Sequence, residues 1–202
     1  RPPIYGKAVA VSCDEECRRG IPVIKKLRKQ TTVPISIDTV KSEVARKALE
    51  SGADIINDIS AMADEGMIEV AAESAAPLIL MHRRGTPVTM QSNTDYVDLI
   101  GEVYSFLERR IERARQGGVS QWGIDPGLGF SKTVGGNFML LKHMRHFANL
   151  GCPLLVGASR KSFIWKTLGE TADEALEGSL ALAVLSRAAG AHILRVHDVQ
   201  AS

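Results

Sequence analysis

The sequence predicts an α/β fold, the (β/α)8 TIM barrel, with about six β-α units present in its 202 residues. Three observations favour this fold. Short apolar runs alternate with longer segments of helical spacing, the runs are apolar throughout, and most of them end in a polar side chain. Strands without polar alternation are typical of a parallel sheet that helices cover on both faces.

Six apolar runs bounded by proline, glycine or polar residues are predicted as strands. They are PISIDT (34–39), DIINDIS (54–60), PLILMH (77–82), QWGIDPG (121–127), PLLVGAS (153–159) and AHILRVHD (191–198). Helices are predicted near 13–29, 41–52, 64–75, 95–117 and 137–149, with a helical region near 161–190. Ser12 followed by Glu15 forms a capping box that opens the first helix.

The strand ends distinguish a barrel from a doubly wound sheet. Polar residues fall at or just past successive strand ends: Asp38, Asn57, His82, Asp125, Lys161, Arg195 and His197. A barrel gathers its strand ends at one mouth, whereas a doubly wound sheet places ligands at one switch point. Polar groups from six different strands favour the barrel. We expect residues 1–202 to form one barrel domain, with two strands and a last helix lying outside this segment.

Composition limits the classes of function. Hydrophobic residues make up 45% of the chain and charged residues 24%, which predicts an ordered globular domain. A net charge of +2 argues against nucleic acid or an anionic membrane as partner. The longest apolar stretches are too short for a membrane span, and no signal-peptide pattern is seen. A cytoplasmic location follows as an expectation, or an organelle if the source is eukaryotic.

The strand-end acids and amide predict recognition of a nitrogen heterocycle. A carboxylate accepts two parallel N–H bonds well, and Asp38, Asn57 and Asp125 supply such acceptors. An aminopyrimidine-like ring presents the matching donors. Two alternatives stay open: Asp38 could cap the helix after it, and DPGLGF (125–130) could be a plain turn. Helix capping by Asp125 is the weaker alternative, because the next helix is predicted about ten residues later.

Cationic residues after the last two strands predict an anion site. SRKS (159–162) and RVH (195–197) occupy the positions where barrels commonly bind phosphate. Arginine offers a bidentate fork and lysine a point charge for phosphate oxygens. A solvated basic loop is the alternative for the SRKS segment. Arg195 favours the anion site, because an arginine on a buried strand would need an anionic partner.

Other motifs give weaker evidence about function. GLGFSKT lacks the glycine that a P-loop has before its lysine, and no G-x-G-x-x-G is present. HMRH (143–146) places two histidines on one helix face without a third zinc ligand. His82 is either a core histidine or part of the site. Three residues are expected to be free, non-catalytic thiols: Cys13, Cys17 and Cys152.

Five segments together resemble the dihydropteroate synthase family. They are SIDTVKSEVARKALESGADIINDIS, LMHRRG, DPGLGFSKT, GASRKSFI and RVHDV, in family order across almost the whole chain. The resemblance implies a (β/α)8 barrel that joins 7,8-dihydropterin-6-ylmethyl diphosphate to p-aminobenzoate, releasing pyrophosphate and forming dihydropteroate for folate. It also implies a sulfonamide target, a homodimer and, in some members, a longer multifunctional folate-pathway polypeptide.

The resemblance assigns roles to positions of this sequence. It implies catalytic roles for Asp38, Asp125 and Lys161. It implies pterin contacts from Asp38, Asn57 and Asp125 with Lys161 nearby, and diphosphate contacts from Arg195 and His197. Aminobenzoate would be flanked by Phe130, Ser162 and a mobile loop that contains Arg1. Further substrate contacts are implied for Met81, Gly157 and Val196.

The implied chemistry needs no protein nucleophile, since the amine of aminobenzoate attacks the pterin methylene. Cationic residues and a Mg²⁺ cofactor would stabilise the leaving pyrophosphate. No metal ligand is assigned in this sequence, because the family's NVTPDSF-like motif, whose Asn helps to hold Mg²⁺, is absent. The GGEST motif is also absent, RPPIYGKAVAVS is longer than the family loop, and Trp165 replaces a usual glycine.

Three other functions remain open. A methyltetrahydrofolate:corrinoid methyltransferase domain of the same superfamily would share the acids and the amide, but it has no use for pyrophosphate contacts. A barrel aldolase would use Lys161 as a Schiff base. A non-catalytic pterin-binding remnant would keep the ring contacts alone.

Overall fold

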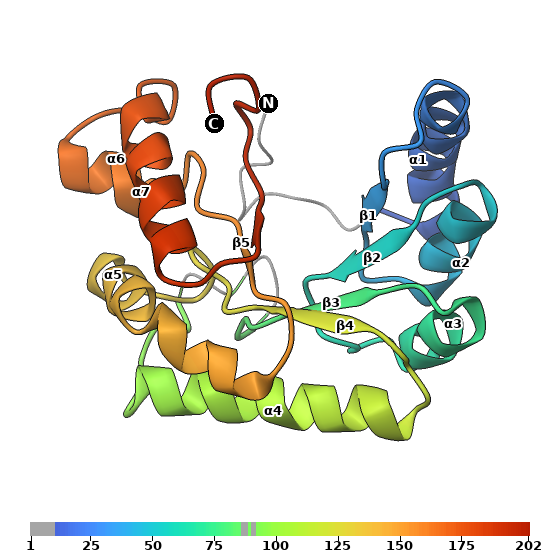
Figure 1. Ribbon diagram of the computed structural model, residues 1–202, viewed down its shortest axis with the longest axis horizontal. Helices are drawn as coiled ribbons and strands as arrows, with labels where there is room; N and C mark the ends of the chain where they lie inside the picture. The colour runs from blue at the N-terminus through green and yellow to red at the C-terminus, as the bar shows by residue number, and fades with distance from the viewer. Residues whose placement is uncertain (1–10, 86–88, 90–91) are drawn as a thin grey trace. The chain divides into compact units, whose positions relative to one another are not determined.

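The computed structural model describes residues 11–85, 89 and 92–202 (Figure 1). These residues form two compact units, which are described separately. Among the described residues, the first unit comprises 11–81 with 109–123, and the second comprises 82–85, 89, 92–108 and 124–202. The chain therefore passes between the units inside helix α4 (Leu99–Gln116) and inside strand β4 (Trp122–Asp125).

The first unit is a parallel sheet flanked by helices. Its elements are α1 (Cys13–Arg28), β1 (Ser36–Asp38), α2 (Ser42–Glu50), β2 (Ile55–Asp58), α3 (Gly66–Ser74) and β3 (Leu78–Met81). β1 pairs with β2 and β2 with β3, all parallel, and the sheet order is β1-β2-β3-β4. The start of β4 belongs to this unit, since Leu78 N–H donates to the Gln121 carbonyl at 3.0 Å.

Helices of the first unit pack in sequence along its strands. α1 contacts α2, and α2 contacts α3, and all three lie along the same side of β1–β3 in Figure 1. Ile24 of α1, Ala48 of α2 and Ala53 form a buried apolar cluster. The serine hydroxyl of Ser12 accepts from Glu15 N–H at 3.3 Å, as the capping box predicts. Glu15 itself pairs with Arg18 and Arg19.

The second unit continues from the end of β4. Its elements are the first part of α4, α5 (Val134–Lys142), the 3-10 helix η1 (Met144–Leu150), β5 (Leu155–Val156), α6 (Ser162–Leu168), α7 (Leu176–Ala188) and β6 (Ile193–Leu194). Ile124 of β4 forms a parallel bridge with Leu154, and β5 pairs in parallel with β6. The ends of β4, β5 and β6 are thereby brought to neighbouring positions.

All six predicted strands are present, and their helices follow in the predicted order. The helical region 161–190 is two helices, because Gly169 ends α6 with a φ of +73°. The prediction that both faces of each strand are buried is confirmed for β3 but is wrong for β1 and β6. Within the described residues, β1 pairs only with β2 and β6 only with β5, so Ile193 is 40% exposed.

Two negative predictions can be compared with the described residues. None of the described helices combines the length and apolar character that crossing a membrane requires. Cys13, Cys17 and Cys152 are all free thiols. Burial raises the pKa of the Cys152 thiol to about 11, so this thiol stays protonated at neutral pH.

Candidate active site

Two polar strand ends of the first unit lie side by side. Asp38 stands opposite Asn57 in the β1–β2 register, and Asn57 Nδ2 donates to Asp38 Oδ1 at 2.5 Å. Asn57 is 5% exposed, and its Oδ1 is buried without a hydrogen-bond partner among the described residues. An unpaired buried acceptor costs free energy. A ligand N–H placed at Asn57 Oδ1 would therefore be stabilising.

Asp38 differs from its sequence-based description in one respect. Asp38 is exposed, because β1 is an edge strand of the described sheet. The prediction that its charge is buried is therefore wrong. The first turn of α2 is capped by another residue: Asp64 Oδ2 accepts from Ser42 N–H at 2.8 Å. Met81, the last residue of β3, is fully buried.

Asp58 is a residue that the sequence analysis missed. It follows Asn57 directly and is completely buried, and its carboxylate accepts from Ser60 N–H, Ser60 Oγ and Met62 N–H at 2.6–2.8 Å. These bonds hold Ala61 and Met62 at positive φ, a conformation that side chains rarely adopt. An Asp at the end of a strand is a signal for an Asx-type turn, in which the carboxylate accepts from the backbone N–H two residues on.

In the second unit, DPGLGF forms a tight turn after β4. Asp125 Oδ1 accepts from Gly127 N–H at 2.8 Å, so a turn is part of this motif's role. Gly127 has a φ of +74°, and a Cβ there would lie 1.9 Å from the His82 carbonyl oxygen. Both the backbone conformation and the close approach require glycine.

The chain after the turn is fixed by α5. Asn137 Oδ1 accepts from Gly129 N–H at 2.6 Å. Thr133 is the N-cap of α5, and its hydroxyl accepts from Gly136 N–H, so the helix starts at Val134 and not near Asn137. Glycines in the first turn concealed this start. Asp125 is bonded within its own turn while Thr133 caps α5, which is consistent with rejecting helix capping as the role of Asp125.

Asp125 combines burial with nearby cations. It is 6% exposed, and burial raises the pKa of its carboxyl group above the ordinary value. The Gly127 N–H and the charges of Lys161, Lys132 and Arg195 act in the opposite direction. A ligand that donates N–H groups to this buried carboxyl group would stabilise its ionised form.

Lys161 and Arg195 extend the second-unit site from β5 and β6. Lys161 Nζ lies 3.9 Å from the centroid of the Phe130 ring, within the range of a cation–π contact. Arg195 N–H donates to the Val156 carbonyl at 2.9 Å, and a Cβ on Gly157 would lie 3.8 Å from Arg195 Cβ. Asp125, Phe130, Gly157, Lys161 and Arg195 are therefore parts of one local cluster.

His197 is held by the loop that follows β5. Ser159 Oγ accepts from His197 N–H at 3.2 Å and lies 3.1 Å from His197 Nδ1. Val196 is half-buried beside it, and Ser162 begins α6. The loops that follow β5 and β6 are therefore in contact at Ser159 and His197.

Arg160 and Arg195 differ from what the sequence predicts. Arg160 does not offer its fork to an anion from solution: its Nε and Nη2 donate to Asp198 at 2.9 and 2.8 Å. Asp198 is only three residues beyond Arg195, and this pairing could not be seen from spacing alone. Arg195 itself is exposed, because β6 is a two-residue strand with an exposed edge.

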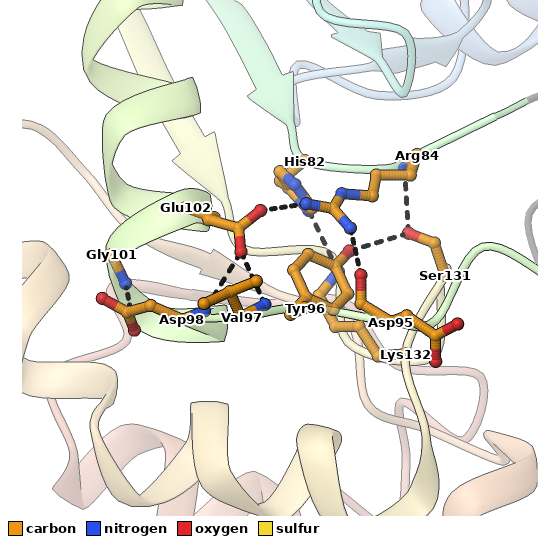
Figure 2. A network of polar contacts seen from close by, with 10 residues as sticks. All are labelled: His82, Arg84, Asp95, Tyr96, Val97, Asp98, Gly101, Glu102, Ser131 and Lys132. Atoms are coloured by element: carbon orange, nitrogen blue, oxygen red, sulfur yellow. Dashed lines mark hydrogen bonds and ion pairs between the residues drawn. The ribbon is translucent and has the colours of Figure 1, made fainter.

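His82 is a buried core histidine with a bonded ring nitrogen. Its Nδ1 lies 3.1 Å from Lys132 Nζ, and its ring meets that of Phe106 edge-on at 4.9 Å. Burial, together with the charges of Lys132 and Arg84, lowers the pKa of His82 to about 2. The imidazole is therefore neutral. Figure 2 shows His82, Lys132 and Arg84 within one polar network.

Comparison with known proteins decides the family. The model of the family described as "Pterin binding enzyme" matches residues 5–197. The dihydropteroate synthase of Synechocystis sp. is 50% identical over 198 residues, covering 96% of this chain and 68% of that protein. The chain belongs to the pterin-binding enzymes and, among them, to the dihydropteroate synthases.

Solved structures of the family agree with the fold. The Xanthomonas albilineans dihydropteroate synthase with 4-aminobenzoic acid matches at a TM-score of 0.92 and 40% identity, covering 98% of this chain and 71% of that one. The same enzyme in complex with 7,8-dihydropteroate matches at 0.89 and 40% identity, covering 95% and 71%. The family fold is the (β/α)8 barrel, of which this chain provides a part, as the strand ends predicted.

All predicted site residues except Arg1 lie in the described part of the chain. Asp38, Asn57 and Met81 lie in the first unit, and Asp125, Phe130, Gly157, Lys161, Ser162, Arg195, Val196 and His197 lie in the second. Arg1 lies outside the described residues. Each motif of the resemblance that carries a predicted side chain begins in a strand or directly after one, as a barrel site requires.

Proposed function

We propose that this protein condenses 7,8-dihydropterin-6-ylmethyl diphosphate with p-aminobenzoate to give dihydropteroate and pyrophosphate, which makes it a transferase of folate biosynthesis. The observation that carries this is the second-unit cluster. A buried carboxylate, Asp125, shares it with Lys161 and Arg195, which come from the next two strand ends. Such a cluster suits a ligand that has ring donors at one end and an anion at the other.

Asp125 and Asn57 are proposed to bind the pterin ring. Asp125 accepts from the amino and ring N–H groups, which removes the cost of its burial. Asn57 Oδ1 gains the donor that it lacks among the described residues. Asp38 holds the Asn57 amide in place through the 2.5 Å bond and adds negative charge that favours an electron-rich pterin.

Arg195, His197 and Lys161 are proposed to bind the diphosphate. The guanidinium of Arg195 fits two phosphate oxygens, and the Lys161 ammonium supplies a point charge. Ser159 orients the His197 ring through Nδ1, which leaves Nε2 as its second polar atom. Gly157, directly after β5, is proposed as a further substrate contact, and Val196 lies between Arg195 and His197 in the sequence.

The reaction exchanges one bond for another at the pterin methylene. The C–O bond to the diphosphate breaks with its electron pair going to oxygen, and the aminobenzoate nitrogen forms a C–N bond and releases a proton. Positive charge that develops on the methylene is stabilised by the anionic Asp125 and Asp38. The negative charge of the leaving group is stabilised by Arg195 and Lys161, a preorganised electrostatic effect. No side chain becomes covalently attached.

Aminobenzoate is proposed to lie against Phe130 and Ser162. Phe130 is 7% exposed and its ring lies 3.9 Å from the Lys161 ammonium, so its position beside the proposed ring and anion sites is fixed. Arg1 is proposed to complete this side. By the same family relation, which includes a Yersinia pestis structure with a sulfonamide drug, we propose that sulfonamides compete here.

Mg²⁺ is proposed as the cofactor on the family resemblance. In the described part of the chain, no three His, Cys, Asp or Glu residues are grouped to hold an ion. Magnesium commonly binds substrate phosphates and water with few protein ligands, so binding together with the diphosphate is compatible with these residues. There it would further neutralise the leaving group.

Oligomeric state, location and gene organisation also follow from the family resemblance as proposals. We propose a homodimer, a cytoplasmic location and, as an alternative arrangement, membership in a longer multifunctional folate-pathway polypeptide. Sedimentation analysis of the protein and sequencing of its complete gene test these points directly.

The proposed function is tested by product formation. Incubation with dihydropterin diphosphate, p-aminobenzoate and Mg²⁺ should give dihydropteroate and pyrophosphate in equal amounts, measured by mass spectrometry and a coupled pyrophosphate assay. Pterin binding without turnover would support the non-catalytic remnant. Methyl transfer from methyltetrahydrofolate, or a borohydride-trapped adduct at Lys161, would favour the methyltransferase or aldolase.

A further inference from the structure

Lys132 is enclosed directly beneath the DPGLGF turn. Lys132 is 5% exposed, and its Nζ has three hydrogen-bond partners. Nζ lies 2.9 Å from the Gly127 carbonyl, 2.8 Å from the Phe130 carbonyl and 3.1 Å from His82 Nδ1. An ammonium has three N–H donors, so the cation is fully matched when His82 accepts at Nδ1.

The two carbonyls that Lys132 binds control side chains of the proposed site. Gly127 is bonded through its N–H to the Asp125 carboxylate. Phe130 places its ring beneath the Lys161 ammonium. A shift of either carbonyl would therefore move the proposed pterin acceptor or the proposed aminobenzoate face.

The turn is also held by contacts that do not involve the Lys132 ammonium. Asn137 Oδ1 binds Gly129 N–H, and Arg84 N–H donates to Ser131 Oγ at 2.9 Å. Ser131 is buried and has a φ of +48°, an uncommon conformation for a side-chain-bearing residue. Figure 2 shows Ser131 beside Lys132, with Arg84 bridging to Glu102 and Asp95. Lys132 therefore supports a turn that Asn137 and Arg84 also hold through separate hydrogen bonds.

A buried cation is a costly way to support a turn. Burial lowers the pKa of Lys132 to about 7, and the nearby charges of Lys161 and Arg84 act in the same direction while Asp125 opposes them. His82, the other titratable group in contact, is neutral. An apolar side chain would avoid this cost, but it could not bind two carbonyls at once.

We infer that Lys132 is a positioning residue for the synthase reaction, whose ammonium holds the Gly127 and Phe130 carbonyls so that Asp125 and Phe130 meet the substrates. This inference rests on the proposed function. Lys132 itself touches neither substrate. Its effect passes through the turn.

The matched variants are Lys132→Met and Lys142→Met. Methionine keeps an unbranched chain without donors, and Lys142 is an exposed lysine at the end of α5 in the same unit. In Lys132→Met we expect KM for the dihydropterin diphosphate to rise at least tenfold with kcat lowered less than threefold. An inflection in kcat/KM near pH 7 should disappear. Lys142→Met should match the parent.

Amide hydrogen exchange without substrate tests the same point independently of turnover. Residues 125–133 should exchange at least tenfold faster in Lys132→Met, while α7 stays as protected as in the parent. A parent protein without synthase activity would contradict the proposed function, and the exchange result together with pterin affinity would then decide the role of Lys132. If Lys132→Met does not fold, His82→Leu removes one of the three partners and should show a smaller change in the same direction. Unchanged exchange, or KM within threefold and an unchanged pH profile, would overturn the inference.

Discussion

Asp38 and Asn57 face each other across β1 and β2, and the Asn57 amide donates to the Asp38 carboxylate at 2.5 Å. The bond fixes the amide so that its Nδ2 is used internally. Asn57 Oδ1 remains a buried acceptor without a partner among the described residues. We propose that a ligand N–H supplies the donor that this acceptor lacks.

Replacement of Asn57 should therefore separate binding from stability. Asn57→Leu removes one hydrogen bond but also removes an unsatisfied buried oxygen, so the free energy of unfolding should change by less than about 1 kcal/mol. Pterin affinity should fall at least about tenfold, or 1.4 kcal/mol. Urea unfolding and calorimetry measure the two effects. Large loss of stability with retained pterin affinity would show that the oxygen has a structural partner.

Arg195 provides the test of the anion end. Arg195→Ala should weaken pyrophosphate binding by about 1.5–3 kcal/mol, the usual worth of a charge-assisted hydrogen bond. Binding of a pterin without diphosphate should change far less. Arg145→Ala, an exposed arginine on η1, is the control. Equal losses for the two ligands in calorimetry would contradict the division of the site into ring and anion ends.

Lys132 predicts a particular dependence of stability on pH. Its pKa is about 7 in the folded protein against an ordinary value of 10.5. Between these values the unfolded chain binds more protons, so the free energy of unfolding should rise as pH increases. One proton corresponds to about 1.4 kcal/mol per pH unit, so the parent should gain up to about 2–3 kcal/mol from pH 7.5 to 9.5.

Lys132→Met should lack this gain. The two unfolding curves should therefore diverge over the same pH range, with the parent gaining stability relative to the variant. Urea denaturation at both pH values measures the difference. Parallel behaviour of parent and variant would show that Lys132 keeps its ordinary pKa.

Sequence patterns were sufficient to locate the strands, and the roles of the site residues stay predictions. Uniformly apolar runs locate β2, β3 and β4, and the polar residue at each end is a local feature of the sequence. The start of α5 was misplaced, because Gly135 and Gly136 weaken helical propensity while Thr133 supplies the cap. Exposure of β1 and β6 could not be predicted, since it depends on which strands become neighbours.

Long-range pairings were the part that the sequence could not provide. SRKS was predicted as a cationic loop, but Arg160 is bound by Asp198, which is 38 residues away. Lys132 was considered only when a P-loop was excluded. Its burial follows from the turn folding back over it and from His82, which is 50 residues away. Neither partner can be identified from spacing.

Asp125 gives the most direct test of the whole account, because the account depends on its buried carboxylate accepting the pterin N–H groups. Asp125→Asn keeps the size of the side chain but replaces one acceptor oxygen with a donor that faces the donors of the ring. Calorimetric titration with a pterin should show a loss of at least about 2 kcal/mol, or roughly thirtyfold in affinity. Asp173→Asn, at an exposed aspartate of the second unit, should bind like the parent. Affinity of Asp125→Asn within about threefold of the parent would contradict the central claim that this carboxylate anchors the pterin ring.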